Sequence, residues 1–196
     1  MLLILACLAL LALPGRSALA QGRNADVGQL RLERSGDGLL LYATVRFDLP
    51  QVVEDALLRG VPMHFVAEAE VTRYRWYWSD LKVAHAQRHM RLAYQPLTRR
   101  WRLNSSADPI TASSLGMSLS QSFDSLADAL SALQRISGWR IAEPGQVETD
   151  VTHKVQFRFA LDLTQLPRPF PIGALGQADW SISASANQQI GPEGGR

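Results

Sequence analysis

A strict two-residue alternation over residues 147–163 is the feature that most constrains the fold of this chain. The odd positions are mostly apolar: Val147, Thr149, Val151, His153, Val155, Phe157, Phe159, Leu161 and Leu163. The even positions are mainly polar or charged. Because successive side chains of a strand point to opposite faces, this pattern predicts a long strand with one face in the core and one in water. We interpret His153, on the apolar side, as a packed core residue.

Shorter alternating segments at both ends of the chain extend this prediction to several strands. Residues 30–33 and 39–49 alternate on either side of Ser35-Gly36-Asp37-Gly38, which predicts a hairpin closed by an Asp-Gly turn. Further strands are predicted over 63–78, 81–94, 100–103 and 178–184. Within 63–78 the large apolar residues change from odd to even positions, so we expect a bulge or bend close to Thr72 and Arg73.

Two helices are predicted between the strands. Residues 50–59 begin with a proline at a plausible first helical position and stop at Gly60. Residues 123–136 carry an apolar stripe at helical spacing, which we expect to cover a sheet face. The candidate caps of this second helix are Ser122 or Asp124 at its start and Gly138 at its end.

Two segments lack a strong periodicity. The serine-rich stretch 104–120 is predicted to be a loop, and the proline-rich stretch 166–173 an extended connector. The fold class that results is mainly β (α+β), an antiparallel β-sandwich-like domain with one or two packed helices.

The N-terminus predicts export. An apolar run over residues 2–13 is followed by Pro14 and Gly15 and then by a small-residue A-x-A site, which indicates a signal peptide over residues 1–20. The run is shorter than the about 20 residues that cross a bilayer, and no later stretch approaches that length. We therefore expect a periplasmic protein without a stable membrane span after cleavage.

The predicted cleavage also restricts the chemistry available to the mature chain and gives the start of its domain. The only cysteine, Cys7, lies in the leader, so disulfides, thiol catalysis and zinc–cysteine sites are excluded from the mature chain. We expect a single exported β-rich domain over 21–186 and a flexible tail over 187–196. A chain of this length buries enough surface to fold without disulfides or a structural metal.

Charge is concentrated in one part of the chain. Residues 73–102 contain eight basic residues and one acid, a formal charge of +7, whereas the whole chain has Lys+Arg 20 against Asp+Glu 18. Arginine interleaved with tyrosine and tryptophan is typical of binding hot spots. The candidate binding residues are Arg73, Arg75, Trp76, Tyr77, Trp78, Arg88, Arg91 and Arg99. The alternative is that the tryptophans are core and the arginines their solvated reverse face.

Other candidate sites have simpler explanations. His85 and His89 are four residues apart, but a strand with both facing solvent explains them better than a metal site. Glu68 and Glu70 share a strand face and are the only carboxylate pair proposed for a hydrolase, yet they also suit ion pairs with Arg73 and Arg75 across the bend. No cofactor, metal or catalytic residue is therefore predicted, and an envelope hydrolase is the third choice.

Several motifs resemble one bacterial family. They are Gly60-Val61-Pro62-Met63-His64-Phe65-Val66-Ala67-Glu68-Ala69-Glu70, Arg73-Tyr74-Arg75-Trp76-Tyr77-Trp78-Ser79-Asp80, Arg91-Leu92-Ala93-Tyr94, Phe123-Asp124-Ser125-Leu126-Ala127-Asp128-Ala129-Leu130, Gly138-Trp139 and Leu166-Pro167-Arg168-Pro169-Phe170. In this order they resemble the domain of unknown function 4390 (DUF4390). The resemblance implies an exported envelope protein without an established activity, often encoded near a nitrogen-regulation-type sensor histidine kinase, and it supplies no catalytic residues.

Two functions of different classes follow from these observations. The first is a non-enzymatic binding or regulatory module whose contact surface is the segment 73–102, with an envelope protein or an anionic surface as partner. Export makes nucleic acid an improbable partner. The alternative is a carrier in which Trp76, Trp78, Phe157 and Phe159 line a cavity for an apolar or lipid ligand.

Overall fold

Nine strands form two antiparallel sheets in the computed structural model, which describes residues 25–73, 80–111, 113–166 and 180–192. The three-stranded sheet has the order β1-β2-β7, and the six-stranded sheet has the order β6-β5-β4-β3-β8-β9. The strands are β1 (Ala25–Ser35), β2 (Gly38–Phe47), β3 (Met63–Arg73), β4 (Leu81–Gln95), β5 (Arg100–Ser106), β6 (Leu119–Phe123), β7 (Arg135–Ala142), β8 (His153–Leu161) and β9 (Ser183–Ile190). The predicted sandwich-like α+β fold is confirmed.

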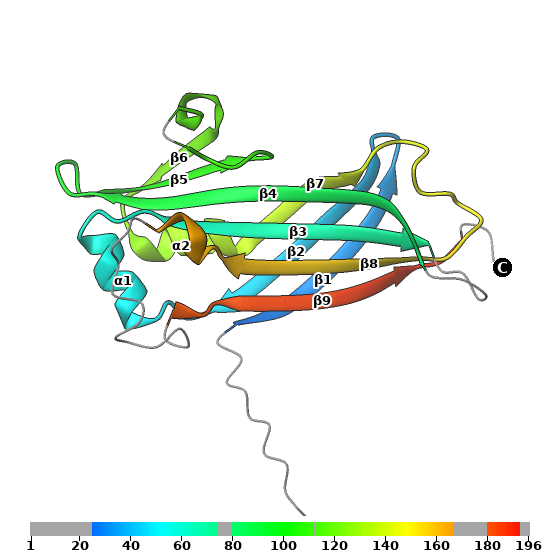
Figure 1. Cartoon of the computed structure of the whole chain (residues 1–196), viewed down its shortest axis with the longest axis horizontal. Coiled ribbons are helices and arrows are strands. Elements are labelled where there is room, and N and C mark those ends of the chain that lie inside the picture. Colours follow the sequence, from blue (N-terminus) through cyan, green and yellow to red (C-terminus); the bar gives the residue numbers. More distant parts are fainter. Residues whose placement is uncertain (1–24, 74–79, 112, 167–179, 193–196) are drawn as a thin grey trace, which may run out of the picture.

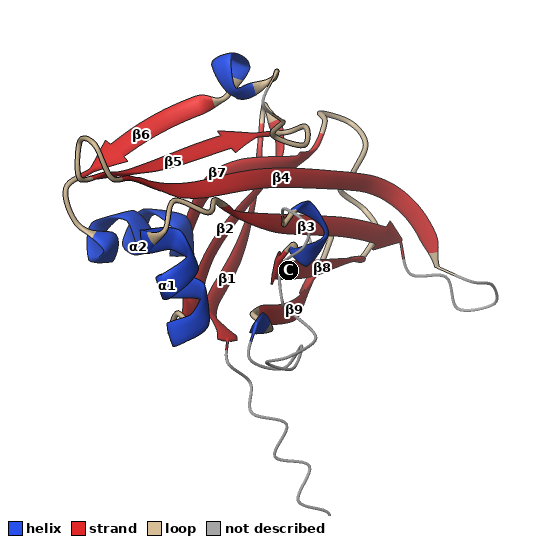
Figure 2. Ribbon diagram, turned by 60° about the vertical axis from the view of Figure 1, so that its left-hand side comes forward, coloured by secondary structure: helices blue, strands red, loops and turns tan. Residues whose placement is uncertain are grey.

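The two sheets lie face to face. The strands of the three-stranded sheet cross diagonally behind the six-stranded sheet, as Figure 1 shows. The sheets also approach each other at both sides, where β1 contacts β9 and β7 contacts β4. Figure 2 shows the same arrangement turned by 60° about the vertical axis.

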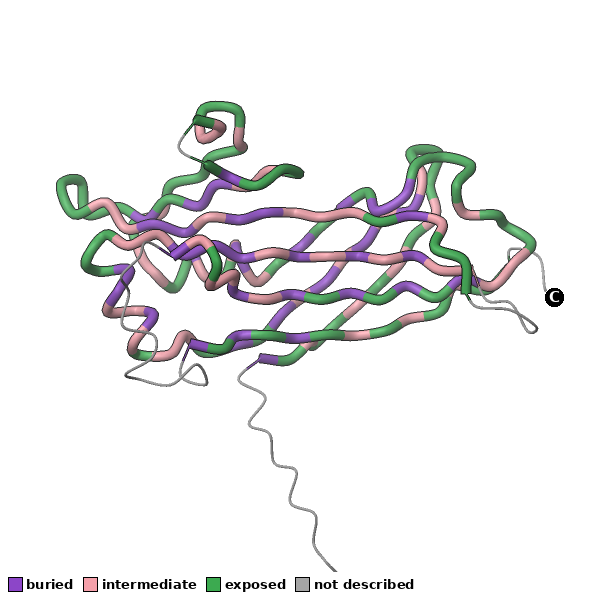
Figure 3. The backbone as a smooth tube through the Cα atoms, viewed as in Figure 1, coloured by how far each residue is buried: buried purple, intermediate pink, exposed green. Residues whose placement is uncertain are grey.

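The core fills this space with the inner-facing residues of both sheets. Buried and exposed residues alternate along the strands (Figure 3), as the period-two pattern predicted. Phe47, Phe65 and Phe159 form a stacked cluster with ring centroids 5.6–6.0 Å apart. Burying each such side chain contributes about 1.5–3 kcal/mol, so this cluster is a principal anchor between the sheets.

Both helices lie at one end of the sandwich (Figure 1). Helix α1 (Gln51–Leu58) confirms the predicted short helix, with Pro50 as its N-cap and not its first residue, and buries Val53, Ala56 and Leu57. Neither helix is long and apolar enough to cross a bilayer, within the residues that the structure describes.

Helix α2 (Leu126–Gln134) is shorter at both ends than predicted. Its N-cap is Ser125 rather than Ser122 or Asp124, and the Ser125 hydroxyl accepts a hydrogen bond from the Asp128 N–H at 3.1 Å. Residues 119–123 are already used by β6, so the helix starts later. At its other end the chain passes directly into β7, and Gly138, the predicted stop, lies inside that strand with φ 56°.

Strand β8 begins at His153, six residues after the start of the alternating pattern. The neighbouring strands explain this boundary, because Arg73 at the end of β3 and Ile190 at the end of β9 both pair with His153. No described strand extends further to supply hydrogen bonds for residues 147–152. His153 itself is fully buried, as predicted, and its Nδ1 donates to the Val151 carbonyl at 3.0 Å.

Three further boundaries differ from the predictions. The β1–β2 loop is Gly36–Asp37, because Ser35 pairs with Gly38, so the turn lies one residue earlier than Asp37-Gly38. The expected bulge near Thr72 exists as a register shift between Val71 and Thr72, but the extra residue is Val83 on β4. Strand β9 runs to Ile190, four residues past the predicted domain end.

The serine-rich segment 104–120 is not simply a loop. It contains the end of β5, a short 3-10 helix, η1 (Leu115–Met117), and the start of β6, with a second short helix, η2 (Leu163–Gln165), elsewhere. Strand β6 pairs with β5 from Trp101–Phe123 to Ser105–Leu119. The prediction was wrong for 119–120, where Leu119, Gln121 and Phe123 alternate with serines, a strand pattern that the serine-rich composition obscures.

Candidate binding surface

The described residues of the basic segment 73–102 do not form one continuous surface. Arg73 ends β3, Arg88 and Arg91 lie on opposite faces of β4, and Arg99 lies in the β4–β5 turn with φ 53°. The other predicted binding residues, Arg75, Trp76, Tyr77 and Trp78, lie outside the described residues. The described cations therefore have to be considered as separate groups.

The first group, at the end of β3 and the start of β4, is paired with acids. Arg73 Nη1 lies 3.0 Å from Glu148 Oε1, and Lys82 forms an ion pair with Glu70. Glu148 lies between β7 and β8, 75 residues further along the chain than Arg73. Glu70 lies on β3, the strand next to that of Lys82. Each of these two described cations is thus compensated by an acid.

Arg88 points into the space between the sheets. It pairs with Ala67 in the β3–β4 register, on the same face as Phe65 and Phe159. Its guanidinium lies 5.3 Å from the ring centroid of Trp139, and burial lowers the pKa of Arg88 from its ordinary value. Arg88 therefore packs where β4 meets β7 and does not belong to an outer contact surface.

Arg91 and Arg102 form the second group, on the outer face of the six-stranded sheet. One cross-strand row contains His64, Arg91, Asn104 and Ser120, and the next contains Ala93, Arg102 and Ser122. Leu92 and Leu103, between these rows, face the core. Because neighbouring strands lie about 4.8 Å apart, the two guanidinium groups occupy one small area.

The electrostatics of this area favour an anion. Burial lowers the pKa of Arg91, and the nearby charge of Arg102 lowers it further. Neither side chain forms an ion pair or hydrogen bond with any other part of the chain that the structure describes. Burial and the charge of Arg91 also lower the pKa of His64, while Asp162 raises it. An incoming carboxylate relieves this repulsion.

Buried polar groups lie beside the two arginines. Asn104 is 3% exposed, and its Nδ2 donates to Ser118 Oγ at 2.9 Å, which ties the segment after β5 to the sheet. His89 is 9% exposed, so the predicted solvent-facing histidine pair is wrong for His89, while His85 is exposed. Ile110 is buried outside the main core cluster, consistent with the segment after β5 covering this outer face.

Strand β6 is a free edge next to β5, which carries Arg102, and two strands from Arg91. Among the described residues it pairs with β5 alone, and it lies at the upper border of the sheet in Figures 1 and 2. Leu119 on β6 is 76% exposed, and Met117 just before it is 85% exposed. An exposed edge with apolar side chains is a template for pairing with another extended chain. Sequence reasoning missed it because 104–120 was predicted to be a loop.

The carboxylate pair is engaged by neighbouring side chains. Glu68 Oε1 accepts a hydrogen bond from Gln87 at 2.8 Å, and Glu68 Oε2 lies 3.8 Å from Arg158. Glu70 pairs with Lys82. Pairing with bases was the simpler explanation, but the described partner of Arg73 is Glu148 rather than Glu68 or Glu70.

Two of the four residues predicted to line a carrier cavity are described by the structure, and both lie in the core. Phe157 and Phe159 are fully buried, and Phe159 belongs to the stacked aromatic cluster. A hollow of about 290 Å³ touches Phe159, but it is shared with Asp26, Arg158 and two serines of β9. Trp76 and Trp78 lie outside the described residues.

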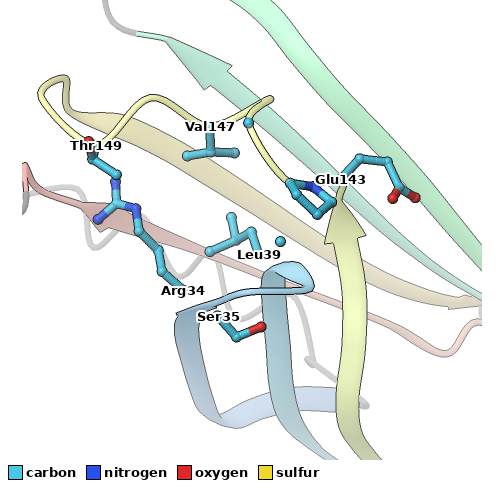
Figure 4. A pocket seen from close by; sticks show the side chains of 9 residues that line it. Arg34, Ser35, Leu39, Glu143, Val147 and Thr149 are labelled. Carbon is cyan, nitrogen blue, oxygen red and sulfur yellow. The ribbon is translucent and has the colours of Figure 1, made fainter.

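A further hollow of about 310 Å³ lies between the β1–β2 turn and residues 143–149. In Figure 4, Leu39 and Val147 face each other across it, and Arg34 extends toward Thr149. Arg34 donates to the carbonyls of Gly191 at 2.8 Å and Glu148 at 3.4 Å. The arginine of this hollow thus fastens the loop and the end of β9, which is a structural role.

These features define a small antiparallel β-sandwich protein whose outer face carries a basic patch beside a free strand edge. No group of three or more histidine, cysteine or acidic side chains suited to a metal occurs within the described ranges. The family model described as "Domain of unknown function (DUF4390)" matches residues 22–190, so the chain belongs to that family. Neither the curated proteins nor the solved structures contain a match.

Proposed function

We propose that this protein is an exported, non-enzymatic binding or regulatory module that holds its partner at the β4–β6 corner. We define this corner by Arg91, Arg102, Leu119, Ser120, Gln121 and Ser122. The observation that carries the proposal is that Arg102, on β5, lies next to the unpaired edge strand β6, with Arg91 one strand further in and its pKa lowered by the charge of Arg102.

The corner favours an extended acidic segment of an envelope protein as partner. An added strand takes its main-chain hydrogen bonds from the edge of β6, and its alternate side chains then lie beside Ser120 and Ser122 on the outer face of the sheet. Ser122 pairs with Arg102, and Ser120 with Asn104, which is next to Arg91. An acid of the added strand beside Ser122 is thus directed toward Arg102, Arg91 adds positive charge one strand further in, and Leu119 offers an apolar contact.

Export and the sensor kinase complete the proposal. The signal over residues 1–20 delivers the protein to the periplasm, where the extracytoplasmic part of an envelope sensor kinase is the first partner to test. Mass spectrometry of the purified mature protein checks the export step, with Gln21 as the expected first residue.

Site-specific crosslinking in intact cells tests the contact surface. A photoreactive residue at Gln121, on β6, is compared with one at Gln189, an exposed glutamine on β9 at the opposite border of the sheet. We expect a discrete adduct from position 121 alone, lost when Arg91 and Arg102 are both changed to Glu. Equal adducts from both positions, or an adduct indifferent to the two charge reversals, would exclude this corner.

A further inference from the structure

The three-stranded sheet carries a hollow on its outer face, away from the β4–β6 corner. Its volume is about 330 Å³, at the small end of the about 300–1,000 Å³ that ligand pockets occupy. The lining residues are Gln29, Arg31, Tyr42, Ala43, Thr44, Arg135, Ile136 and Ser137. Ala43 and Ile136 are buried with side chains on the core face, so the hollow reaches down to the sheet backbone.

A bulge in β7 creates this hollow. Leu41 pairs with Trp139 and Ala43 with Ile136, so Tyr42 on β2 faces two residues, Ser137 and Gly138, on β7. Gly138 adopts φ 56°, a left-handed conformation that glycine allows at little cost. An ideal Cβ on Gly138 meets only the Tyr42 hydroxyl, at 4.0 Å, so space remains above the bulge.

The register brings the polar groups of the hollow into two adjacent rows. Gln29, Thr44 and Arg135 form one row across β1, β2 and β7. Arg31 and Tyr42 form the next row, with Ser137 at the bulge. With strands about 4.8 Å apart and same-face residues about 6.6 Å apart, these groups fit within roughly 10 by 7 Å, which is the scale of one sugar ring.

The side chains present both cationic and neutral groups to the solvent. Arg31 lies over the Tyr42 ring at 4.4 Å, which orients its guanidinium, and its only described ion pair is an exposed one with Glu33 at 3.4 Å. Arg135, Thr44 and Ser137 make no side-chain hydrogen bond or ion pair with the rest of the described chain. Three hydroxyls and an amide thus lie between two arginines.

We propose that this hollow binds an acidic saccharide, a sugar ring that carries a carboxylate or a phosphate. The oxyanion is held by Arg135 and Arg31, because guanidinium groups bind such anions through paired, charge-assisted hydrogen bonds. Hydroxyl groups of the sugar both donate and accept hydrogen bonds, so they can pair with the hydroxyls of Thr44, Ser137 and Tyr42 and with the Gln29 amide. The absence of a carboxylate from the lining residues favours an anion over a cation.

NMR titration of the full mature chain tests this site. The probes are galacturonate and glucose 6-phosphate, with glucose and inorganic phosphate as the matched neutral and ring-free compounds. We expect saturable shifts of the Ser137 and Gly138 amides with at least one acidic sugar, and at least tenfold weaker binding of glucose and of phosphate. Binding of galacturonate alone identifies a carboxylate ligand, and binding of glucose 6-phosphate alone a phosphate ligand.

Two variants decide whether the hollow is responsible. Arg135→Gln is expected to weaken binding at least fivefold. Arg140→Gln, on the same outer face of β7 but paired with Glu143 at 3.5 Å, is expected to leave it unchanged. Backbone shifts outside β7 verify that both variants fold. The proposal is overturned if neither acidic sugar gives saturable shifts, if phosphate alone binds as well as the sugars, or if the two variants weaken binding equally.

Discussion

The two ends of the β3–β4 ladder carry similar positive charges but hold them differently. At one end, Arg73 and Lys82 each lie against an acid, Glu148 and Glu70. At the other end, Arg91 lies beside Arg102, and the pKa of Arg91 is lowered by burial and by that neighbouring charge. The net charge of a segment therefore does not identify a binding surface. The acids that the fold brings to it decide which cations remain available.

Each end also contains a buried histidine. His153 pairs in register with Arg73, and His64 with Arg91. Burial is the main cause that lowers the pKa of both, but at His153 the Val151 carbonyl and Glu148 oppose this effect. At His64 the charge of Arg91 adds to it, and only Asp162 opposes. The charges of Arg34 and Arg73 also lower the pKa of His153, so at both ends burial and neighbouring cations disfavour the protonated ring.

The largest effect is expected from reversing the unpaired charges. Changing Arg91 and Arg102 to Glu should reduce partner capture more than tenfold, equivalent to about 1.4 kcal/mol or more, because both cations lose their attraction for an acidic segment. Changing Arg73 and Lys82 to Glu is the matched control and should leave capture near the wild-type level. Quantitative crosslinking from position 121 measures both. A control pair that is as damaging as the first pair would remove the distinction between the ends.

A smaller effect is expected from the exposed apolar residue of the edge. Leu119→Ser should lower capture by about threefold or more without lowering the melting temperature, because the side chain is 76% exposed in the free protein. Leu58→Ser, on helix α1, removes another exposed leucine, 48% exposed, and serves as the control. Capture that depends equally on both leucines would indicate nonspecific hydrophobic association instead of docking at β6.

The pH dependence of stability should follow the two histidines. Because the pKa values of His64 and His153 are lowered from 6.5, the unfolded chain binds protons more readily than the folded chain. The free energy of unfolding should therefore fall as pH drops below about 6.5, and level off below the folded-state pKa values. Chemical denaturation across this range measures the fall.

One variant tests whether part of this pH dependence arises at the end of the ladder that contains Arg91 and Arg102. Arg91→Gln should raise the pKa of His64 toward its ordinary value and leave His153 unchanged, as measured from the ring protons by NMR. The fall in stability at low pH should then be shallower than in the wild type. A shift of His153 of the same size would show that the effect is a general change in charge.

The smallest effect is expected at the compensated end. Glu148→Gln breaks the ion pair between Glu148 and Arg73. The Glu148 side chain is 47% exposed and the Arg73 side chain 33% exposed. Such partly exposed pairs contribute at most about 1 kcal/mol, so the melting temperature should fall by less than about 4 °C. A double-mutant cycle with Arg73→Gln isolates the pair, and 1 M salt should remove most of the coupling. A coupling unaffected by salt would point to a role for Glu148 beyond this ion pair.

Much of the fold could be predicted because its signals are local. The alternation over 153–161 and the stop at Gly60 depend on residues close in sequence, and both appear in the structure. The failures share one cause. Strand β8 starts where its neighbours end, and β6 forms because β5 is available to pair with it. Both boundaries depend on residues far away in the chain.

The candidate site was only partly predictable. The sequence singled out Arg91, which the structure places on the outer face, but it grouped it with Arg88, which faces the opposite side of β4 and packs on Trp139. Arg102 and the free edge were not among the predicted binding residues. Arg88 and Arg91 are three residues apart and both follow the bulge at Val83, so period-two alternation already places them on opposite faces of β4. Which of the two faces the core depends on how β4 pairs with strands that are distant in the sequence.

The sequence by itself determined the class of fold, the approximate strands, both helices and the membership in the family, because these follow from side-chain period, capping and motif order. The tertiary structure decided which cations are neutralised, which strand is left as an edge, and where the bulge opens a hollow in the three-stranded sheet. The physical reason is that strand pairing joins residues far apart in the chain, so the surroundings of a charge or an edge exist only after the sheets have formed.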